Sequence, residues 1–342
     1  MTPKFCPHLD LEANMAITFG IYPGGLLGDE QGIVHPVSPD DPDRVNAALD
    51  ALQGDADTLS VRAYRSFAET VTPYGPAPAD PQAYLRRGRT LDLVLQFREP
   101  SGRLDGWTDF VRAAVRDGGP DLARVQICEE PNLDLPPVDG STPNVLNALV
   151  QGVVAAKEEA RSLGRRIAVG FNAVPSFDPA DTFWSDLGTL AGPGFRQSLD
   201  YVGLDFFPDV FRPVAPGRLA DAVTAVLTSY RRTCLPKAGI PDTIPVRICE
   251  NGWPTGPGRT ERQQAAALDT VIRTTAALAA ELNIDGYSLF ALRDADSRAE
   301  GLFPHFGLLY DDYTPKPAFD GYRRLIAELG ARPGPPRPGL AG

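Results

Sequence analysis

Short apolar runs rich in β-branched residues recur along the chain, and this repeat constrains the fold more than any other feature. The eight runs are AITFGIY from Ala16, TLSVRAY from Thr58, LDLVLQF from Leu91, RVQICEE from Arg124, RIAVGFN from Arg166, DYVGLDFF from Asp200, IPVRICE from Ile244 and GYSLFAL from Gly286. Successive runs start about 30 to 45 residues apart, the length of a strand, a crossover helix and two loops. They are nearly continuous, as expected for parallel strands buried on both faces. Eight consecutive βα units predict one α/β domain, a closed (β/α)8 TIM barrel, over residues 1–330.

The segments between the runs have the pattern of amphipathic helices, as at 145–163 and 261–282. Thr142 precedes Pro143, which predicts an N-cap followed by proline at the first helical position. Thr260 with a glutamine three residues later predicts a capping box. These start signals support helices between the strands.

A doubly wound open sheet is the structural alternative. It would require a glycine-rich first turn that leads directly into a helix. The first turn here, YPGGLLGDEQG, has Pro23 in place of the first glycine of the nucleotide-binding motif, and a long loop follows. We therefore favour the barrel.

Charge and composition exclude several classes of partner. The chain has 33 Lys and Arg against 44 Asp and Glu, so its formal charge is −11, and neither a nucleic acid nor an anionic membrane surface is an expected partner. No apolar run approaches the roughly 18 residues of a membrane span. The amino end lacks the features of a secretory signal, so we expect a cytoplasmic protein. Residues 331–342 are rich in proline and glycine and are expected to form a flexible tail, and nothing in the sequence indicates an oligomeric state.

Metal and thiol chemistry are weakly supported. The four cysteines, at positions 6, 128, 234 and 249, form no C-x-x-C pair, so separate reduced thiols are expected. The three histidines, His8, His35 and His305, lie outside the strands, which argues against a three-histidine zinc centre and against a base for a cysteine nucleophile. A carboxylate site for Mg²⁺ or Ca²⁺ stays open, but no cofactor or metal is predicted.

Two runs end in glutamate. The fourth continues as ICEEPN, with Glu129 and Glu130, and the seventh as ICENGWP, with Glu250. Barrel enzymes carry their chemistry at the carboxyl ends of the strands, so both runs deliver a carboxylate to the mouth. Cleavage of a glycosidic bond needs two such groups, because one protonates the leaving oxygen and the other attacks or activates water. The alternative is that these glutamates are solvated loop residues.

These motifs resemble those of the clan of retaining barrel glycoside hydrolases. Glu-Pro-Asn resembles the clan's Asn-Glu-Pro motif, which implies that Glu130 is the acid/base. ENGWPTG is similar to the nucleophile strand of β-glucosidases and plant-type β-1,3-glucanases, which implies that Glu250 is the nucleophile. Arg62 stands where the clan has an arginine near the nucleophile. DYVGLDFF, GYSLFALRDADS and FGLLYDDYTPKPAFDGYRRLI resemble the last strands and closing helix of β-glucosidases.

The same resemblance implies the residues that contact a small-molecule or oligosaccharide glycoside. They are Arg62, Glu129, Asn132, Asp205, Phe207, Asn251, Trp253 and Phe290. Trp253 could stack on a sugar ring or pack the loop, and Arg62 and Asn251 would hold the nucleophile. Trp107 and Trp184 are expected in the core. His305 and Arg293 could line the substrate pocket, but we expect them at the surface.

The chain also departs from the clan. Glu129 replaces the asparagine before the acid/base, Phe206 or Phe207 replaces the sixth-strand tyrosine that supports the nucleophile, and Ser297 replaces a sugar-binding glutamate. Neighbouring residues of a strand point to opposite faces, so Glu129 and Glu130 can share the pocket only if the chain turns there. Pro131 favours an extended Glu130.

Three functions remain on this fold. The first is a retaining glycoside hydrolase that acts by double displacement with two glutamates. The second is a transglycosidase or a biosynthetic enzyme that acts on a small natural product. The third is a sugar-binding pseudoenzyme without turnover, and the site has to decide among them.

Overall fold

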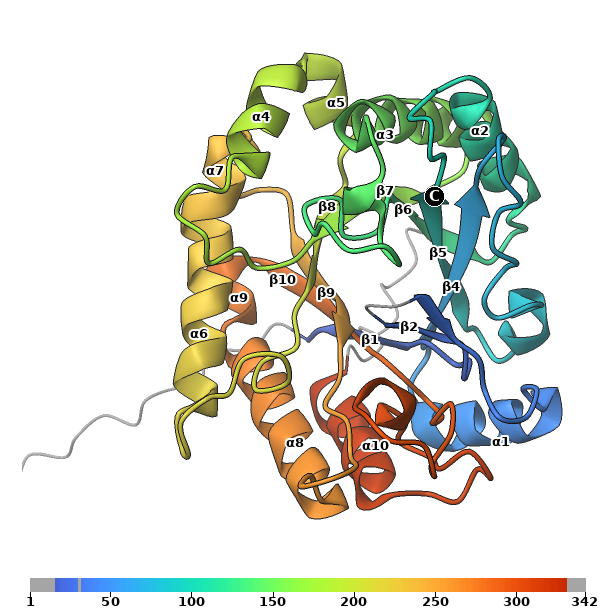
Figure 1. The fold of residues 1–342 in the computed structure, drawn as a ribbon, viewed down its shortest axis with the longest axis vertical. Helices are drawn as coiled ribbons and strands as arrows, with labels where there is room; N and C mark the ends of the chain where they lie inside the picture. Colours follow the sequence, from blue (N-terminus) through green and yellow to red (C-terminus); the bar gives the residue numbers. More distant parts are fainter. Residues whose placement is uncertain (1–15, 30–31, 331–342) are drawn as a thin grey trace, which may run out of the picture.

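The eight apolar runs form the strands of a closed parallel barrel. The computed structural model describes residues 16–29 and 32–330 (Figure 1). The strands are β1 (Thr18–Ile21), β4 (Ser60–Phe67), β5 (Thr90–Phe97), β6 (Leu122–Ile127), β7 (Ala168–Ala173), β8 (Tyr201–Asp205), β9 (Val246–Asn251) and β10 (Ile284–Leu289). Their order around the barrel is β1-β10-β9-β8-β7-β6-β5-β4, and β1 closes it by pairing with β4. The predicted (β/α)8 architecture is confirmed.

The helices surround the barrel (Figure 1). They are α1 (Pro42–Gln53), α2 (Trp107–Asp117), α3 (Val145–Ser162), α4 (Phe183–Leu190), α5 (Pro193–Ser198), α6 (Leu219–Ser229), α7 (Leu235–Lys237), α8 (Glu261–Ala277), α9 (Ala279–Leu282) and α10 (Pro317–Leu329). Short 3₁₀ turns lie at Pro81–Tyr84, Asp139–Ser141 and Phe303–His305, and a π turn at Tyr230–Cys234 follows α6. After β1, a two-stranded hairpin is formed by β2 (Leu27–Asp29) and β3 (Gly32–Val34).

One of the two predicted helix starts is correct. Thr260 and Gln263 form the capping box of α8. The N-cap predicted at Thr142 is wrong, because the Thr142 amide N–H donates to the Asp139 carbonyl at 2.8 Å and closes the preceding 3₁₀ turn. The helix therefore starts at Val145, with Asn144 as its N-cap.

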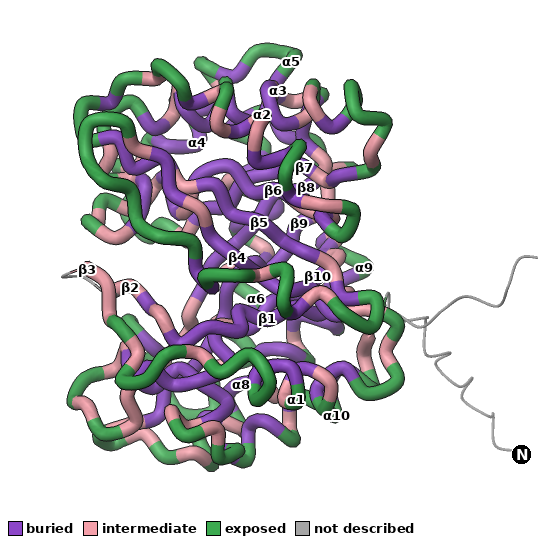
Figure 2. Tube along the Cα trace, turned by 90° about the vertical axis from the view of Figure 1, so that its right-hand side faces the viewer, coloured by how far each residue is buried: buried purple, intermediate pink, exposed green. Residues whose placement is uncertain are grey.

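A continuous apolar core lies between the strands and the helices. In Figure 2 the barrel strands are buried along their length and exposure is concentrated in the surrounding segments. Trp107 of α2 and Trp184 of α4 belong to this core, as predicted, and the Trp107 indole donates to the Ala148 carbonyl of α3 at 2.8 Å. The strand residues that face the helices, such as Val61, Leu93 and Ile248, are fully or almost fully buried.

The interior of the barrel is polar, which the apolar runs did not predict. Arg62, Asp92, Gln126 and Arg247 are all at least 99% buried, and each alternates with apolar residues that pack outward. The strands are thus buried on both faces as expected, but the inner face carries long polar side chains. Gly286 makes room for one of them, since a Cβ there would overlap the Arg247 guanidinium.

The structure also tests the predictions on the cysteines and on membrane-spanning helices. Cys128, Cys234 and Cys249 are free thiols, in agreement with the prediction, and Cys6 lies outside the described residues. The tail predicted at 331–342 also lies outside them. Within the described part of the chain, no helix is long and apolar enough to cross a membrane.

Candidate active site

The Glu250 carboxylate lies at the end of β9 and is held from across the barrel. Its Oε1 accepts hydrogen bonds from the Tyr64 hydroxyl at 2.5 Å and from the Arg62 Nε and Nη2 at 3.2 and 3.1 Å. Its Oε2 accepts none from the described residues. Because β1 and β10 separate β4 from β9 in the barrel, these bonds cross the interior. One carboxylate oxygen is therefore fixed while the other is left free.

Both donors come from one strand. Arg62 and Tyr64 are two residues apart on β4, so their side chains share the inner face. The Arg62 guanidinium also donates to Gln126 Oε1 on β6 at 2.9 Å and to Asp92 Oδ2 on β5 at 3.4 Å. Bonds to residues of three other strands, β5, β6 and β9, fix the guanidinium. This confirms the expectation that Arg62 lies beside Glu250.

Burial dominates the ionisation of Glu250. The residue is 6% exposed, and burial raises the pKa of its carboxyl to about 7, with Arg62 and the Tyr64 hydroxyl acting in the opposite direction. The charge of Glu129 raises the same pKa further. Glu250 thus changes protonation near neutral pH.

Glu130 follows β6 in a turn rather than in an extended strand. Its φ is 46° and that of Cys128 is 62°, so the chain twice enters the left-handed region, and the extended conformation predicted from Pro131 is wrong. The physical reason is a bond to the next strand, since the Glu130 amide N–H donates to Asn172 Oδ1 of β7 at 2.8 Å. These turns free Glu129 and Glu130 from strict alternation.

The Glu130 carboxyl has no hydrogen-bond donor among the described residues. It is 9% exposed, and burial together with the charges of Glu250 and Glu129 raises its pKa well above the usual range. The neutral form is therefore favoured at neutral pH. The charge of Glu250 is thus among the causes that raise the pKa of Glu130.

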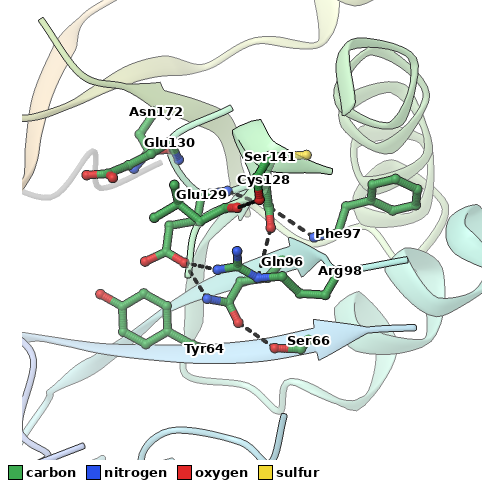
Figure 3. A network of polar contacts seen from close by, with 12 residues as sticks. Tyr64, Ser66, Gln96, Phe97, Arg98, Cys128, Glu129, Glu130, Ser141 and Asn172 are labelled. Atoms are coloured by element: carbon green, nitrogen blue, oxygen red, sulfur yellow. Dashed lines mark hydrogen bonds and ion pairs between the residues drawn. The ribbon is translucent and has the colours of Figure 1, made fainter. Parts of the chain in front are cut away.

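Glu129 belongs to a different network (Figure 3). Its Oε2 accepts hydrogen bonds from Arg98 Nη2 at 2.7 Å and from the Gln96 side-chain amide. Gln96 lies on β5, and Arg98 directly follows that strand. Arg98 is also 3.1 Å from Asp139 Oδ1, and Asp139 Oδ2 accepts the Glu129 amide N–H at 2.7 Å. In Figure 3 the Glu130 carboxyl stands apart from these bonds, beside Asn172.

A small pocket of about 70 Å³ opens above this network. Its walls include Tyr22, Tyr64, Phe290, Arg98 and Glu129. Tyr64 forms part of the wall and also donates to Glu250, so it links the pocket to the buried carboxylate. Neither Glu130 nor Glu250 forms part of the wall.

Several other predicted site residues form hydrogen bonds that stabilise the fold and do not line the pocket. Asn132 exchanges two hydrogen bonds with the Val174 backbone, at 2.9 Å each. The Asn251 side chain donates to the Phe206 carbonyl at 2.7 Å and accepts from Tyr287, so its hydrogen bonds go to these residues and not to the Glu250 carboxylate.

Most of the predicted aromatic and acidic residues also pack inside the protein and do not line the pocket. Trp253 is 6% exposed and Arg259 lies 4.4 Å over its ring, so packing describes it better than an open platform. Asp205 is fully buried and accepts from Asn172. Phe207 packs edge to face on Phe290, and of these residues only Phe290 lines the pocket.

The surface positions predicted for His305 and Arg293 are wrong. Arg293 is fully buried because Asp40 pairs with it at 2.8 Å. His305 is 5% exposed and lines a second cavity of about 610 Å³ with Ser297, whose walls share no residue with the first pocket.

Sequence reasoning missed Tyr64, Asn172, Gln96 and Arg98. Tyr64 had a usable signal, since it stands two residues after Arg62 and must share its face. It supplies from β4 the hydroxyl that the sequence lacks at Phe206 and Phe207. The other three act through contacts between strands that no local motif reveals. Within 16–29 and 32–330, no group of three or more His, Cys, Asp or Glu side chains is arranged to hold a metal ion.

Comparison with known proteins shows the fold. No family model and no curated protein sequence matches the chain. A β-glucuronidase from Ruminococcus gnavus in complex with D-glucuronic acid aligns with a TM-score of 0.59 at 13% identity over 90% of this chain and 48% of that one. A GH2 β-galacturonidase from Eisenbergiella tayi bound to galacturonate gives a TM-score of 0.57 at 13% identity, over 87% and 50% of the two chains. An active-site mutant of a β-1,3-glucanosyltransferase from Rhizomucor miehei, in complex with laminaritriose, gives 0.53 at 16% identity, over 88% and 96%.

This chain spans about half the length of the two uronidases and nearly all of the glucanosyltransferase. All three neighbours act on glycosides by their names, and the shared feature shown at these identities is the barrel.

Proposed function

We propose that this protein is a retaining glycoside hydrolase in which Glu250 is the nucleophile and Glu130 the acid/base. The observation that carries the proposal is the contrast between the two carboxyl groups. Glu250 accepts three hydrogen bonds from a guanidinium and a hydroxyl, which favour its anion. Glu130 accepts none from the described residues, and burial and neighbouring charge favour its neutral form. Two carboxyl groups with different environments are what acid and nucleophile roles require.

In the first step the free Oε2 of Glu250 attacks the anomeric carbon and the bond to the leaving oxygen breaks. The Glu130 proton passes to that oxygen, which leaves as an alcohol. Tyr64 and Arg62 keep Oε1 fixed, so that Oε2 has one orientation.

In the second step the Glu130 carboxylate takes a proton from water while the water oxygen attacks the anomeric carbon. The ester bond to Glu250 breaks, its carboxylate is restored and Glu130 is protonated again. Two inversions at the same carbon give net retention.

A panel of aryl glycosides followed by proton NMR tests this proposal. It should contain glucuronides and galacturonides, on which two structural neighbours act by name, and glucosides, because a third is a β-1,3-glucanosyltransferase by name. We expect the first-formed sugar to keep the anomeric configuration of the substrate. An inverted first product contradicts double displacement, and absence of cleavage across a wide panel contradicts hydrolysis.

Transfer to an acceptor other than water is the second candidate. Glu250 and Glu130 are over 90% buried, which limits the access of water to the intermediate. One neighbour of similar length is a glucanosyltransferase by name. Product analysis with added alcohols separates the two, because a transferase gives alkyl glycosides in preference to free sugar.

A further inference from the structure

The small pocket at the mouth has aromatic walls. Tyr22 stacks on Phe290 with ring centroids 5.3 Å apart and an interplanar angle of 12°. Tyr22 also meets Tyr64 edge to face at 5.3 Å, and Tyr74, 48% exposed, stands at the rim. The pocket is small beside those that enclose whole ligands, so it suits one substituent of a ligand. Aromatic faces of this kind attract cations.

One carboxylate lines the same pocket. Glu129 directs Oε2 to Arg98 and Gln96, and its Oε1 has no hydrogen-bond partner among the described residues. Its side chain is 14% exposed, whereas that of Arg98 is 8% exposed and lies between Glu129 and Asp139. The pocket therefore presents a carboxylate oxygen, while its guanidinium is already shared by two acids.

The surroundings carry more acid than base. Six acidic side chains belong to this network or to the adjoining barrel interior, namely Asp92, Asp139, Asp205, Glu129, Glu130 and Glu250. Arg62 and Arg98 are the guanidiniums that pair with members of this set at the mouth. Burial and the repulsion among these acids raise the pKa of Glu130 and Asp205, and burial raises the pKa of Asp139 to about 7. A cation in the pocket would offset the charge of those acids that stay ionised.

We propose that the pocket formed by Tyr22, Tyr64, Phe290 and Glu129 binds a protonated primary amine of the substrate. The ammonium donates to Glu129 Oε1 and lies against the aromatic faces. The ligand class is a cationic glycoside, with the amine on the sugar or on the leaving group. As a substrate site this rests on the proposed function, whereas as a binding site it can be measured without turnover.

The proposal has a direct consequence for anionic sugars. Two structural neighbours were solved with uronic acids bound. A uronate placed against Glu129 Oε1 would meet a like charge, which disfavours binding. This chain should therefore prefer the opposite charge.

Isothermal titration calorimetry with free sugars in mildly acidic buffer tests the inference on the wild-type protein. Glucosamine is compared with glucose, N-acetylglucosamine and glucuronate, none of which has a glycosidic bond. We expect glucosamine to bind at least about tenfold more tightly than the neutral sugars, and glucuronate the weakest. A ratio near one, or tighter binding of glucuronate, overturns an amine on the sugar.

A second pair of ligands tests an amine on the leaving group. Aminoethyl β-glucoside is compared with ethyl β-glucoside on the Glu250→Gln variant, so that cleavage does not interfere. A preference for the amine here alone assigns it to the leaving group. A ratio near one with both pairs of ligands overturns the inference altogether.

A variant locates the effect. Glu129→Gln should bring the ratio between amine and neutral ligand to about one, whereas Glu158→Gln, which removes an exposed charge on α3, should leave it unchanged. An unchanged ratio in Glu129→Gln contradicts the assignment. If that variant does not fold, the wild-type ligand comparison still decides. Amine preference without cleavage of any glycoside would refute the proposed function alone, and cleavage without amine preference would refute this inference alone.

Discussion

The ends of β6 and β9 each deliver a buried glutamate to the mouth, but they hold it in opposite ways. On β9 the Glu250 side chain is held by three hydrogen bonds, and the residue stays within the strand, which shifts register against β8 and β10 at this point. After β6 the Glu130 backbone is held, through Asn172, while its carboxyl receives no donor from the described residues. The contrast teaches that an anion is stabilised by fixing its oxygen, whereas a neutral acid needs only a fixed backbone and burial.

Glu250→Gln removes the group that is held by its oxygen and should have the largest effect. We expect kcat to fall on the order of 10⁴-fold or more, because an amide cannot form the ester intermediate. Steady-state kinetics on the best aryl glycoside provide the measurement, with Glu158→Gln as the control. Retention of most activity would exclude Glu250 as nucleophile.

The same variant makes a prediction on stability. Folding raises the pKa of Glu250 from 4.5 to about 7, so between these values the unfolded chain binds fewer protons than the folded one. The contribution of Glu250 to stability therefore falls as pH rises through this window. Thermal unfolding across the window should show that Glu250→Gln loses less Tm with rising pH than the wild type. Identical slopes would contradict the assigned pKa.

Glu130→Gln tests the group that is held by its backbone. We expect kcat to fall about 10³-fold for substrates whose leaving alcohol needs a proton, and much less for strongly acidic nitrophenols. Glu129→Gln is the matched variant, since it changes the neighbouring carboxyl. If Glu129→Gln instead shows this dependence on the leaving group, the acid is Glu129.

Tyr64→Phe removes one donor to Glu250 and keeps the ring. Loss of a hydrogen bond to a charged group should lower kcat/KM about 10- to 100-fold.

Activity requires ionised Glu250 and protonated Glu130, so kcat/KM should rise with pH through about 7 and fall above the raised pKa of Glu130. Both limbs of this profile belong to the pair of carboxyl groups.

The hydroxyl of Tyr64 lowers the pKa of Glu250, so its loss should move the rising limb to higher pH. Tyr322→Phe provides the control, because that buried hydroxyl donates to the Gly20 carbonyl away from the site. A rising limb that stays in place in Tyr64→Phe would show that Tyr64 does not tune Glu250.

Asn172→Ala loosens the Glu130 turn and should have the smallest effect. It removes the acceptor of the Glu130 amide N–H, so we expect kcat to fall about 3- to 10-fold, mainly for substrates with poor leaving groups. Asn132→Ala, which loses bonds to the Val174 backbone, should not show this selectivity. Equal loss for all leaving groups in Asn172→Ala would indicate a structural role alone.

The barrel could be predicted from sequence because its signal is local and repeated. Each apolar run and each amphipathic segment reports its own element, and all eight runs are strands. The sequence predictions fail where a contact with a residue far away in the chain determines the conformation or the burial of a side chain. Pro131 favours an extended Glu130, but the hydrogen bond that its amide N–H donates to Asn172 on the next strand holds a turn. Likewise, Arg293 was predicted at the surface because the sequence does not reveal the ion pair with Asp40, a residue far away in the chain.

The candidate site shows the same division. Glu130, Glu250 and Arg62 come from motifs, whereas Tyr64 could be inferred only from its spacing to Arg62. Gln96 and Arg98 had no signal, because they meet Glu129 through the lateral packing of β5 and β6.

The central claim is that Glu250, and not Glu129 or Glu130, forms the bond to the sugar. It is tested most directly by mass spectrometry of the protein after reaction with a fluorinated aryl glycoside, which slows release of the intermediate. We predict one added glycosyl group, on the peptide that contains Glu250. A label on the peptide with Glu129 and Glu130, or turnover with an inverted product and no label, would contradict the account.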